Sequence, residues 1–204
     1  MAEPTHIAAI VLAAGRSTRM GAANKLLADI GGKPMVRHVV EAALASQAHA
    51  VLVVTGHQAD EVRAALARLD VAVATNPDFA TGLSSSLKAG IRALPKHVAG
   101  ALVLLGDMPR IEAAHLDAMI AAWASDAGQT IVVPVHQGQR GNPVLWPADL
   151  FDEMLALEGD VGARTLMIRH THRVREIELG TDAIGMDVDT PDALARLRDA
   201  GRSA

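Results

Sequence analysis

The chain has 204 residues, half of them hydrophobic, which is enough to bury the core of one compact domain. Its formal net charge of −4 and its few aromatic residues (two Phe, two Trp) argue against nucleic acid or an anionic membrane as partner. The absence of cysteine excludes disulfides, thiolate zinc sites and a cysteine nucleophile. No leader or membrane-spanning segment is visible, so we expect a cytoplasmic protein.

Short apolar runs alternate with longer amphipathic segments along the chain. We expect strands near residues 6–13, 50–55, 71–75, 99–105 and 130–135, and helices near 34–47, 58–69, 83–94, 112–125, 147–156, 160–170 and 190–200. This alternation predicts an α/β fold with a mostly parallel, Rossmann-like sheet and helices on both faces. Residues 136–146 interrupt the alternation and predict a loop that leads into a strand.

The first predicted strand leads into a cationic loop, LAAGRSTRMGAANK, at residues 12–25. Loops at the carboxyl ends of strands are where open α/β sheets bind ligands. Gly15 and Gly21 are expected to adopt positive φ and to let backbone amides approach phosphate oxygens. The cations of the loop are Arg16, Arg19 and Lys25. The loop therefore predicts a triphosphate site, the alternative being a flexible surface loop with solvated cations.

Two other phosphate-binding motifs do not fit the chain. A Walker A loop requires GxxxxGK[ST], but Gly32 and Lys33 are followed by Pro34. A dinucleotide fingerprint requires GxGxxG, and the loop offers Gly15 and Gly21 alone. These spacings disfavour a P-loop NTPase and an NAD or FAD enzyme.

A second chemical centre is expected at Asp107, in the sequence GDMP that follows the apolar run 100–105. An acid at the end of a buried strand, beside a proline that stops pairing, is well placed to bind a divalent cation. Mg²⁺ needs only one or two carboxylates when phosphate oxygens and water complete its shell. We predict that Asp107 is a metal ligand, the alternative being a turn or helix-capping aspartate.

Three further segments carry candidate polar residues. Asp187 and Asp189 lie on one face of an extended segment, with Val188 on the other, before Thr190 and Pro191 as the predicted cap and start of the last helix. The alternative is that Asp189 only caps that helix. Three serines at a helix start, more than a cap requires, are candidates for contact with a base or phosphate: Ser84, Ser85 and Ser86. In RGNP, the Asn142 amide and the Arg140 guanidinium are candidates for ligand binding, or form a simple turn.

Other catalytic patterns are missing from the sequence. The nine histidines form no HExxH or clustered metal pattern, so zinc is not expected. Ser17 does not lie in a GxSxG elbow, which leaves a serine hydrolase without support.

The cationic loop resembles the LxxGxxxRMG…K signature of nucleotidyltransferases that join an NTP to a phosphorylated acceptor and release pyrophosphate. Its AAG at 13–15 and NKLL at 24–27 are similar to the molybdenum cofactor cytidylyltransferases, whereas guanylyltransferase relatives more usually have glycine at position 14. Similar segments follow in order at 32–44, 82–91, 104–109, 140–146, 158–164 and 187–194.

The resemblance implies a nucleotide-diphospho-sugar transferase fold and assigns roles to the matching residues. Catalysis is expected from Arg19, Lys25 and Asp107. Nucleotide contacts are expected from Leu12, Ala13, Ala14, Gly15, Arg16, Ser17, Arg19, Lys25, Gly82, Ser84, Ser85, Gly106 and Asp107. Acceptor contacts are expected from Ser86, Arg140, Asn142 and Arg164. A second metal ligand is expected late in the chain, at Asp189 or, as next choice, Asp187.

The resemblance also implies an activity, the transfer of CMP from CTP to molybdopterin with Mg²⁺. We expect one nucleotidyltransferase domain over 1–204, with a nucleotide-binding part to about residue 110 and an acceptor-binding part over about 111–204. A molybdoenzyme or its maturation factor is the expected partner. Alternatives are guanylyl transfer to the same cofactor, transfer to a sugar or alcohol phosphate, and a non-catalytic carrier of the molybdenum cofactor.

Overall fold

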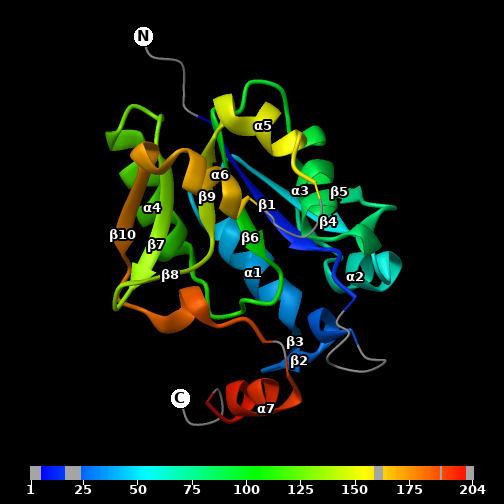
Figure 1. The fold of residues 1–204 in the computed structure, drawn as a ribbon. Helices are drawn as coiled ribbons and strands as arrows, with labels where there is room; N and C mark the ends of the chain where they lie inside the picture. Colours follow the sequence, from blue (N-terminus) through cyan, green and yellow to red (C-terminus); the bar gives the residue numbers. More distant parts are fainter. Residues whose placement is uncertain (1–5, 17–23, 159–162, 189, 201–204) are drawn as a thin grey trace.

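A computed structural model describes residues 6–16, 24–158, 163–188 and 190–200. They form an eight-stranded sheet with helices on both faces and a separate two-stranded ribbon, β2–β3 (Figure 1). The strands are β1 (Ile7–Ala13), β2 (Asp29–Ile30), β3 (Lys33–Pro34), β4 (Ala50–Thr55), β5 (Ala72–Thr75), β6 (Gly100–Leu105), β7 (Ile131–His136), β8 (Gln139–Arg140), β9 (Val144–Pro147) and β10 (Val174–Glu178). The α-helices are α1 (Met35–Ala45), α2 (Ala59–Ala65), α3 (Leu83–Arg92), α4 (Ala113–Ser125), α5 (Phe151–Leu155), α6 (Arg164–Arg169) and α7 (Pro191–Ala200). None of the helices in these ranges is long and apolar enough to cross a membrane.

The sheet has the order β10-β7-β9-β6-β1-β4-β5, with β8 paired to β7. Strands β5, β4, β1 and β6 are parallel, as are β7 and β10, whereas β9 runs antiparallel between β6 and β7. The prediction of a mostly parallel sheet with helices on both faces is confirmed. The predicted helix 147–156 begins later, at Phe151, because Pro147 ends strand β9 and a 3₁₀ turn, Ala148–Leu150, intervenes.

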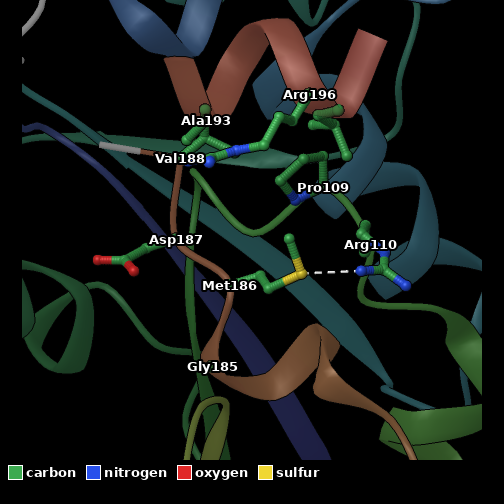
Figure 2. A pocket seen from close by; sticks show the side chains of 9 residues that line it. Pro109, Arg110, Gly185, Met186, Asp187, Val188, Ala193 and Arg196 are labelled. Carbon is green, nitrogen blue, oxygen red and sulfur yellow. Dashed lines mark hydrogen bonds between the residues drawn. The ribbon is translucent and has the colours of Figure 1, made fainter. Parts of the chain in front are cut away.

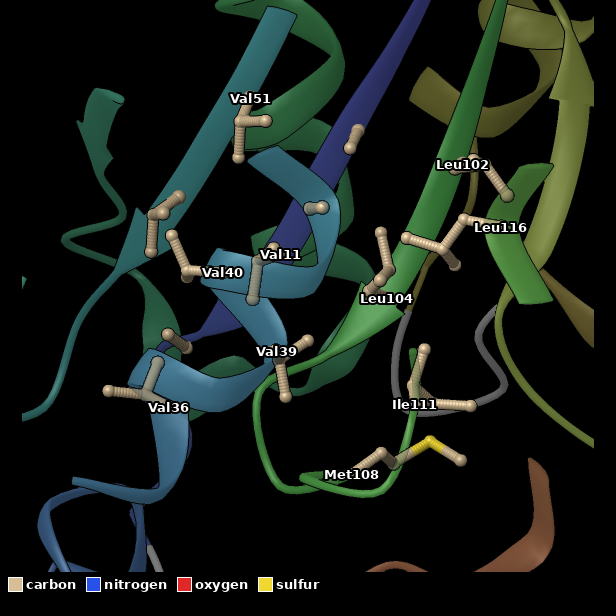
Figure 3. Packing of buried hydrophobic residues seen from close by; sticks show 14 of the residues in the cluster. Val11, Val36, Val39, Val40, Val51, Leu102, Leu104, Met108, Ile111 and Leu116 are labelled. Carbon is tan, nitrogen blue, oxygen red and sulfur yellow. The ribbon is translucent and has the colours of Figure 1, made fainter. Parts of the chain in front are cut away.

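Strand β1 supplies alternate side chains to two hydrophobic layers, as its buried position requires. Ile7, Ala9 and Val11 face α1 and α4, where Val36, Val39 and Leu116 complete the layer seen in Figure 3. Ile10 and Leu12 face the opposite side, against residues of α3, α5 and α6. Because the parallel strands β1, β4 and β6 end at one edge of the sheet, the loops that follow them meet there.

Helix α7 closes the end of the molecule at which the β2–β3 ribbon lies (Figure 1). The Thr190 hydroxyl accepts from the Ala193 amide at 3.2 Å, which confirms the predicted cap, and the helix starts at Pro191 as expected. Leu194 and Val188 pack on Met35 at the start of α1. The Arg198 guanidinium donates to the Asp29 carbonyl at 2.8 Å, so the end of the chain is tied to the region that follows the cationic loop.

Candidate active site

The carboxyl ends of β1 and β6 are closely packed against each other. Leu12 pairs with Leu105, and the Gly106 amide donates to the Leu12 carbonyl at 3.0 Å. A Cβ at position 106 would lie 3.1 Å from that carbonyl oxygen and 3.3 Å from Leu26 Cδ2. Glycine at 106 therefore permits the close contact that holds the following residue, Asp107, beside the loop that leaves β1.

Asp107 forms an ion pair with Lys25 at this edge of the sheet. Lys25 Nζ lies 2.5 Å from Asp107 Oδ2, and the two side chains are 12% and 15% exposed. Lys25 opens a 3₁₀ turn, Lys25–Leu27, in which the Asn24 side chain accepts from the Leu26 amide at 3.1 Å and Leu26 is buried. The structure thus brings together two of the residues expected to act in catalysis, although they are 82 positions apart.

Asp107 is not a helix cap. Helix α4 starts at Ala113, and its cap is Glu112, which shares a reciprocal pair of hydrogen bonds with His115. The main-chain carbonyl of Asp107 accepts instead from the Val188 amide at 3.1 Å. This bond brings residues 186–188, which include the predicted metal ligand Asp187, alongside Asp107.

Asp187 and Val188 point to opposite sides of that segment, as alternation predicts. Val188 is 3% exposed and packs in the core, whereas Asp187 is exposed. In Figure 2 the Asp187 carboxylate points away from Arg110 and Met186, which line a cavity of about 480 Å³ beneath α7. Asp189 lies outside the described residues. Within the described residues, no three His, Cys, Asp or Glu side chains form a group that could hold a metal ion. The acidic residues described near the ends of β1 and β6 are Asp107 and, on the adjoining segment, Asp187.

The start of the cationic loop is wedged against the loop that follows β4. The Ala14 carbonyl accepts from the His57 amide at 3.3 Å, and a Cβ at Gly56 would lie 2.8 Å from the Ala14 Cβ. The same Cβ would lie 2.6 Å from that of Phe79. Sequence reasoning missed this contact, for which the glycine directly after the apolar run 50–55 was the available signal.

The expectation for Gly15 is wrong in one respect. Its φ is not in the positive range, and a Cβ there would have no heavy atom within 4 Å. The backbone at Gly15 therefore does not require glycine, and the open space beside it is where a phosphate would approach. Arg16 is exposed beside it. Ser17, Arg19 and Gly21 lie outside the described residues.

The three serines of α3 are mostly engaged by the protein. Gly82 is the N-cap, with φ of 115°, and no side chain caps the helix. The Asn76 amide donates to the Ser85 hydroxyl at 2.8 Å and to that of Ser86 at 3.1 Å. Ser84 and Ser86 are 3% and 5% exposed. Their contacts with a nucleotide or acceptor stay a prediction, and Ser86 does not line the pocket described next, which holds the other predicted acceptor residues.

A pocket of about 450 Å³ opens beside the strand ends. Three of the predicted acceptor residues, Arg140, Asn142 and Arg164, line it. Its apolar wall, which sequence reasoning did not identify, is formed by residues of β1, α3, β6, β7, β9 and α6: Leu12, Leu83, Leu87, Val103, Leu105, Val133, Val144, Trp146, Met167 and Ile168. Leu83 and Ile168 are 44% and 69% exposed, so the wall of the pocket includes apolar surface that is open to solvent.

The polar side of this pocket is held by hydrogen bonds to β7, β10 and the segment around Ile184. The main-chain amide of Asn142 donates to the Ile184 carbonyl at 2.8 Å, and the main-chain amide of Gly141 donates to the Pro134 carbonyl at 3.0 Å. A Cβ at Gly141 would overlap the Ile184 carbonyl. Arg140 Nε donates to Glu176 on β10 at 2.6 Å, and both side chains are 47% exposed. The pocket therefore combines an apolar wall with a cationic and amide rim.

Residues 9–174 match the family of MobA-like NTP transferase domains. The chain belongs to this family. Among solved structures, a nucleotidyl transferase from Methanothermobacter thermautotroptrophicus superposes on this MobA-like chain with a TM-score of 0.84, 27% identity and coverage of 98% of this chain and 100% of that one. The Rv0371c protein of Mycobacterium tuberculosis, in a complex with manganese, gives a TM-score of 0.82 at 28% identity, covering 96% and 100%.

Curated relatives of the MobA-like chain differ in what their names describe. The bifunctional protein GlmU of Anaeromyxobacter dehalogenans is 35% identical over 178 residues, which cover 78% of this chain and 35% of the relative. The chain thus spans about a third of the length of that relative. The nicotine blue oxidoreductase of Paenarthrobacter nicotinovorans is 27% identical over 198 residues, which cover 94% of this chain and 96% of the relative.

Proposed function

We propose that this protein is a nucleotidyltransferase that transfers CMP from CTP to the molybdenum cofactor and releases pyrophosphate. The observation that carries the proposal is that the pocket adjoins the strand ends that hold Lys25 and Asp107. Leu12 and Leu105 pair with each other and both line the acceptor pocket, while Asp107 follows Leu105 by two positions. An acceptor seated in the pocket would present its phosphate next to the phosphates of a nucleotide, which is the arrangement that in-line transfer requires.

The chemistry follows from charge and position. An oxygen of the acceptor phosphate forms a bond to the α-phosphorus, and the bond from that phosphorus to the bridging oxygen breaks as pyrophosphate leaves with the electron pair. A phosphate monoester is already a nucleophile, so no general base is needed. Lys25 is assigned to the α-phosphate and Arg19 to the β- and γ-phosphates, where they neutralise charge in the transition state.

The residues at the centre fit a divalent cation. The Asp107 carboxylate is mostly buried and already holds a cationic group, the Lys25 ammonium. Hard oxygen donors suit Mg²⁺ or Mn²⁺, and the Val188 bond keeps the segment of Asp187 beside Asp107. When bound, such an ion neutralises phosphate charge and orients the nucleotide. The manganese complex of the Mycobacterium tuberculosis relative supports this assignment.

The acceptor pocket suits a flat ring system that carries polar groups at one end. Its volume of about 450 Å³ lies within the usual range for small-molecule sites. The apolar wall from Leu83 to Ile168 would cover the ring faces, and Arg140, Asn142 and Arg164 would bind phosphate and amide groups. The choice of CTP rests on the resemblance of the AAG sequence, which has alanine and not glycine at position 14, to the cytidylyltransferases.

The similarity to nicotine blue oxidoreductase over nearly the whole chain gives a second candidate, an oxidation or reduction that involves nicotine blue or a similar compound. The lack of a dinucleotide fingerprint argues against it. A third candidate, a carrier of the molybdenum cofactor for a molybdoenzyme or its maturation factor, would use the pocket without Asp107.

The deciding experiment measures pyrophosphate release from purified protein with Mg²⁺, molybdenum cofactor and each of CTP, GTP, ATP and UTP. We expect release with CTP, loss of release in Asp107→Ala, and normal release in Asp60→Ala, which removes a carboxylate that is 94% exposed. Conversion of nicotine blue with an added redox partner, without pyrophosphate release, would favour the oxidoreductase. Tight cofactor binding without release, unchanged in Asp107→Ala, would favour the carrier.

A further inference from the structure

The ion pair between Lys25 and Asp107 places two expected functions in conflict. A metal ligand must offer its carboxylate oxygens to the ion, yet Oδ2 of Asp107 is paired with the Lys25 ammonium at 2.5 Å. A lysine ammonium and a divalent cation at the same carboxylate would repel each other strongly, since both side chains lie in a mostly buried site. The two cations therefore compete for Asp107.

Both partners are fixed at their backbones, so only the side chains can separate. The backbone of Lys25 belongs to the 3₁₀ turn that Asn24 caps. The buried Leu26 side chain of that turn packs against Gly106, which has no side chain of its own. Asp107 is held by the bond from Val188 to its carbonyl and by its position directly after Gly106. A lysine side chain on a fixed backbone can swing its ammonium by several ångströms from the carboxylate to another acceptor, because its stem has four rotatable bonds.

The phosphates of a nucleotide supply that acceptor. We infer that Lys25 occupies the cation position on Asp107 in the nucleotide-free protein, and that a bound triphosphate draws the ammonium away and so opens the carboxylate to the divalent metal. This inference rests on the proposed function. Nucleotide and metal then bind cooperatively, and each raises the affinity for the other by the same factor.

The same arrangement gives a reason for the burial of the pair. An exposed lysine would leave the carboxylate free for much of the time, whereas a lysine that is 12% exposed stays paired until a competing anion arrives. The protein would thereby avoid an unpaired buried carboxylate before substrate binds and an unpaired ammonium afterwards.

The test measures Mn²⁺ binding to nucleotide-free protein by the electron paramagnetic resonance signal of free Mn²⁺. We expect Lys25→Met to bind Mn²⁺ about tenfold or more tightly than wild type, because the competing cation is gone. Lys25→Gln, which keeps a neutral donor, should show the same direction of change. Asp107→Asn in either background should abolish the gain.

Two control variants separate competition from the loss of a positive charge. Arg16→Met removes an exposed charge from the same loop, and Lys33→Met breaks an exposed lysine–carboxylate pair, in which Nζ lies 2.7 Å from Glu41 Oε2. Both should bind Mn²⁺ within about twofold of wild type, since surface charges interact weakly through water. Equal Mn²⁺ affinity in wild type and in both folded Lys25 variants, checked by their thermal unfolding, would overturn the inference, as would equal gains in Arg16→Met.

A second measurement adds CTP, with its own affinity for Mn²⁺ determined without protein. In wild type the nucleotide should raise the Mn²⁺ affinity of the protein, and in Lys25→Met most of this enhancement should vanish. The nucleotide-free comparison does not depend on the acceptor or on turnover. It can therefore succeed when the proposed activity fails, or fail when that activity is established.

Discussion

The two halves of the site are built in different ways. At the charged edge, Asp107 comes two residues after the end of β6, and Lys25 lies at the end of the loop that leaves the neighbouring parallel strand β1. Gly56, after β4, and Gly106, after β6, allow close contact with the end of β1 and the start of that loop. The pocket of about 450 Å³ that we propose for the acceptor instead depends on β9, which returns antiparallel between β6 and β7, and on α6. The charged edge is thus specified by short motifs after strands, whereas the pocket is specified by the path of the chain.

The largest effect is expected at the charged edge. Lys25→Ala should lower turnover by about 10² or more, because a charge that acts on the transition state is removed from a mostly buried position. The measurement is steady-state pyrophosphate release at saturating CTP. Lys33→Ala, an exposed lysine with its own carboxylate partner, is the matched control and should keep normal turnover. Turnover of Lys25→Ala within a few-fold of wild type would contradict the role of Lys25.

A glycine substitution in each half should affect different properties. Gly141→Ala should cost about 1–3 kcal/mol of unfolding free energy, because its Cβ would overlap the Ile184 carbonyl and the backbone must shift. Gly15→Ala should leave stability unchanged, since its Cβ meets no atom within 4 Å, but should raise the KM for CTP. Urea unfolding and initial rates measure the two properties.

Gly185→Ala is the control for this comparison, because its Cβ also meets no atom within 4 Å although it lies next to Ile184. It should unfold like wild type. A stable Gly141→Ala would show that the rim of the acceptor pocket yields more easily than its contacts indicate.

This contrast explains what the sequence could predict. The buried strands β1, β4, β6 and β7 could be predicted because each is a continuous apolar run, and Asp107 was placed correctly just after one of them. Strand β10, VREIE, was missed because it lies at the edge of the sheet and alternates apolar with charged residues over only 5 positions. Sequence spacing could not show that Trp146 and Ile168 would line one pocket, because this depends on the antiparallel path of β9 and on where α6 packs.

The ion pair between Lys25 and Asp107 could not be predicted from the sequence either. Each residue was assigned a separate partner, a phosphate and a metal ion, and nothing in either motif reports a distance across 82 positions. The burial of Ser86 against Asn76 also needed the fold, because it depends on how α3 packs beneath the loop 76–82.

A smaller effect is expected on the polar rim of the pocket. Arg140→Gln should raise the KM for the acceptor about tenfold and leave that for CTP unchanged, because a half-exposed charge-assisted bond is lost. Glu176→Gln removes the partner of Arg140 and keeps the guanidinium, so the acceptor KM should not rise. An equal increase in both KM values for Arg140→Gln would instead assign Arg140 to a shared structural role.

The smallest effect is expected where the apolar wall meets solvent. Ile168 is 69% exposed, so Ile168→Ser should change the unfolding free energy by less than about 0.5 kcal/mol. If this side chain covers a ring of the acceptor, its loss should raise the acceptor KM by roughly 3- to 10-fold, the usual value of burying an aliphatic side chain in part. Val73→Ser, an exposed position on the edge strand β5, offers the same change of chemistry far from the pocket and should leave both KM values unaltered. Because Ile168 contributes so little to folding, a change in acceptor KM at constant stability would locate the ligand on this wall, and an unchanged KM would place it deeper, against Trp146.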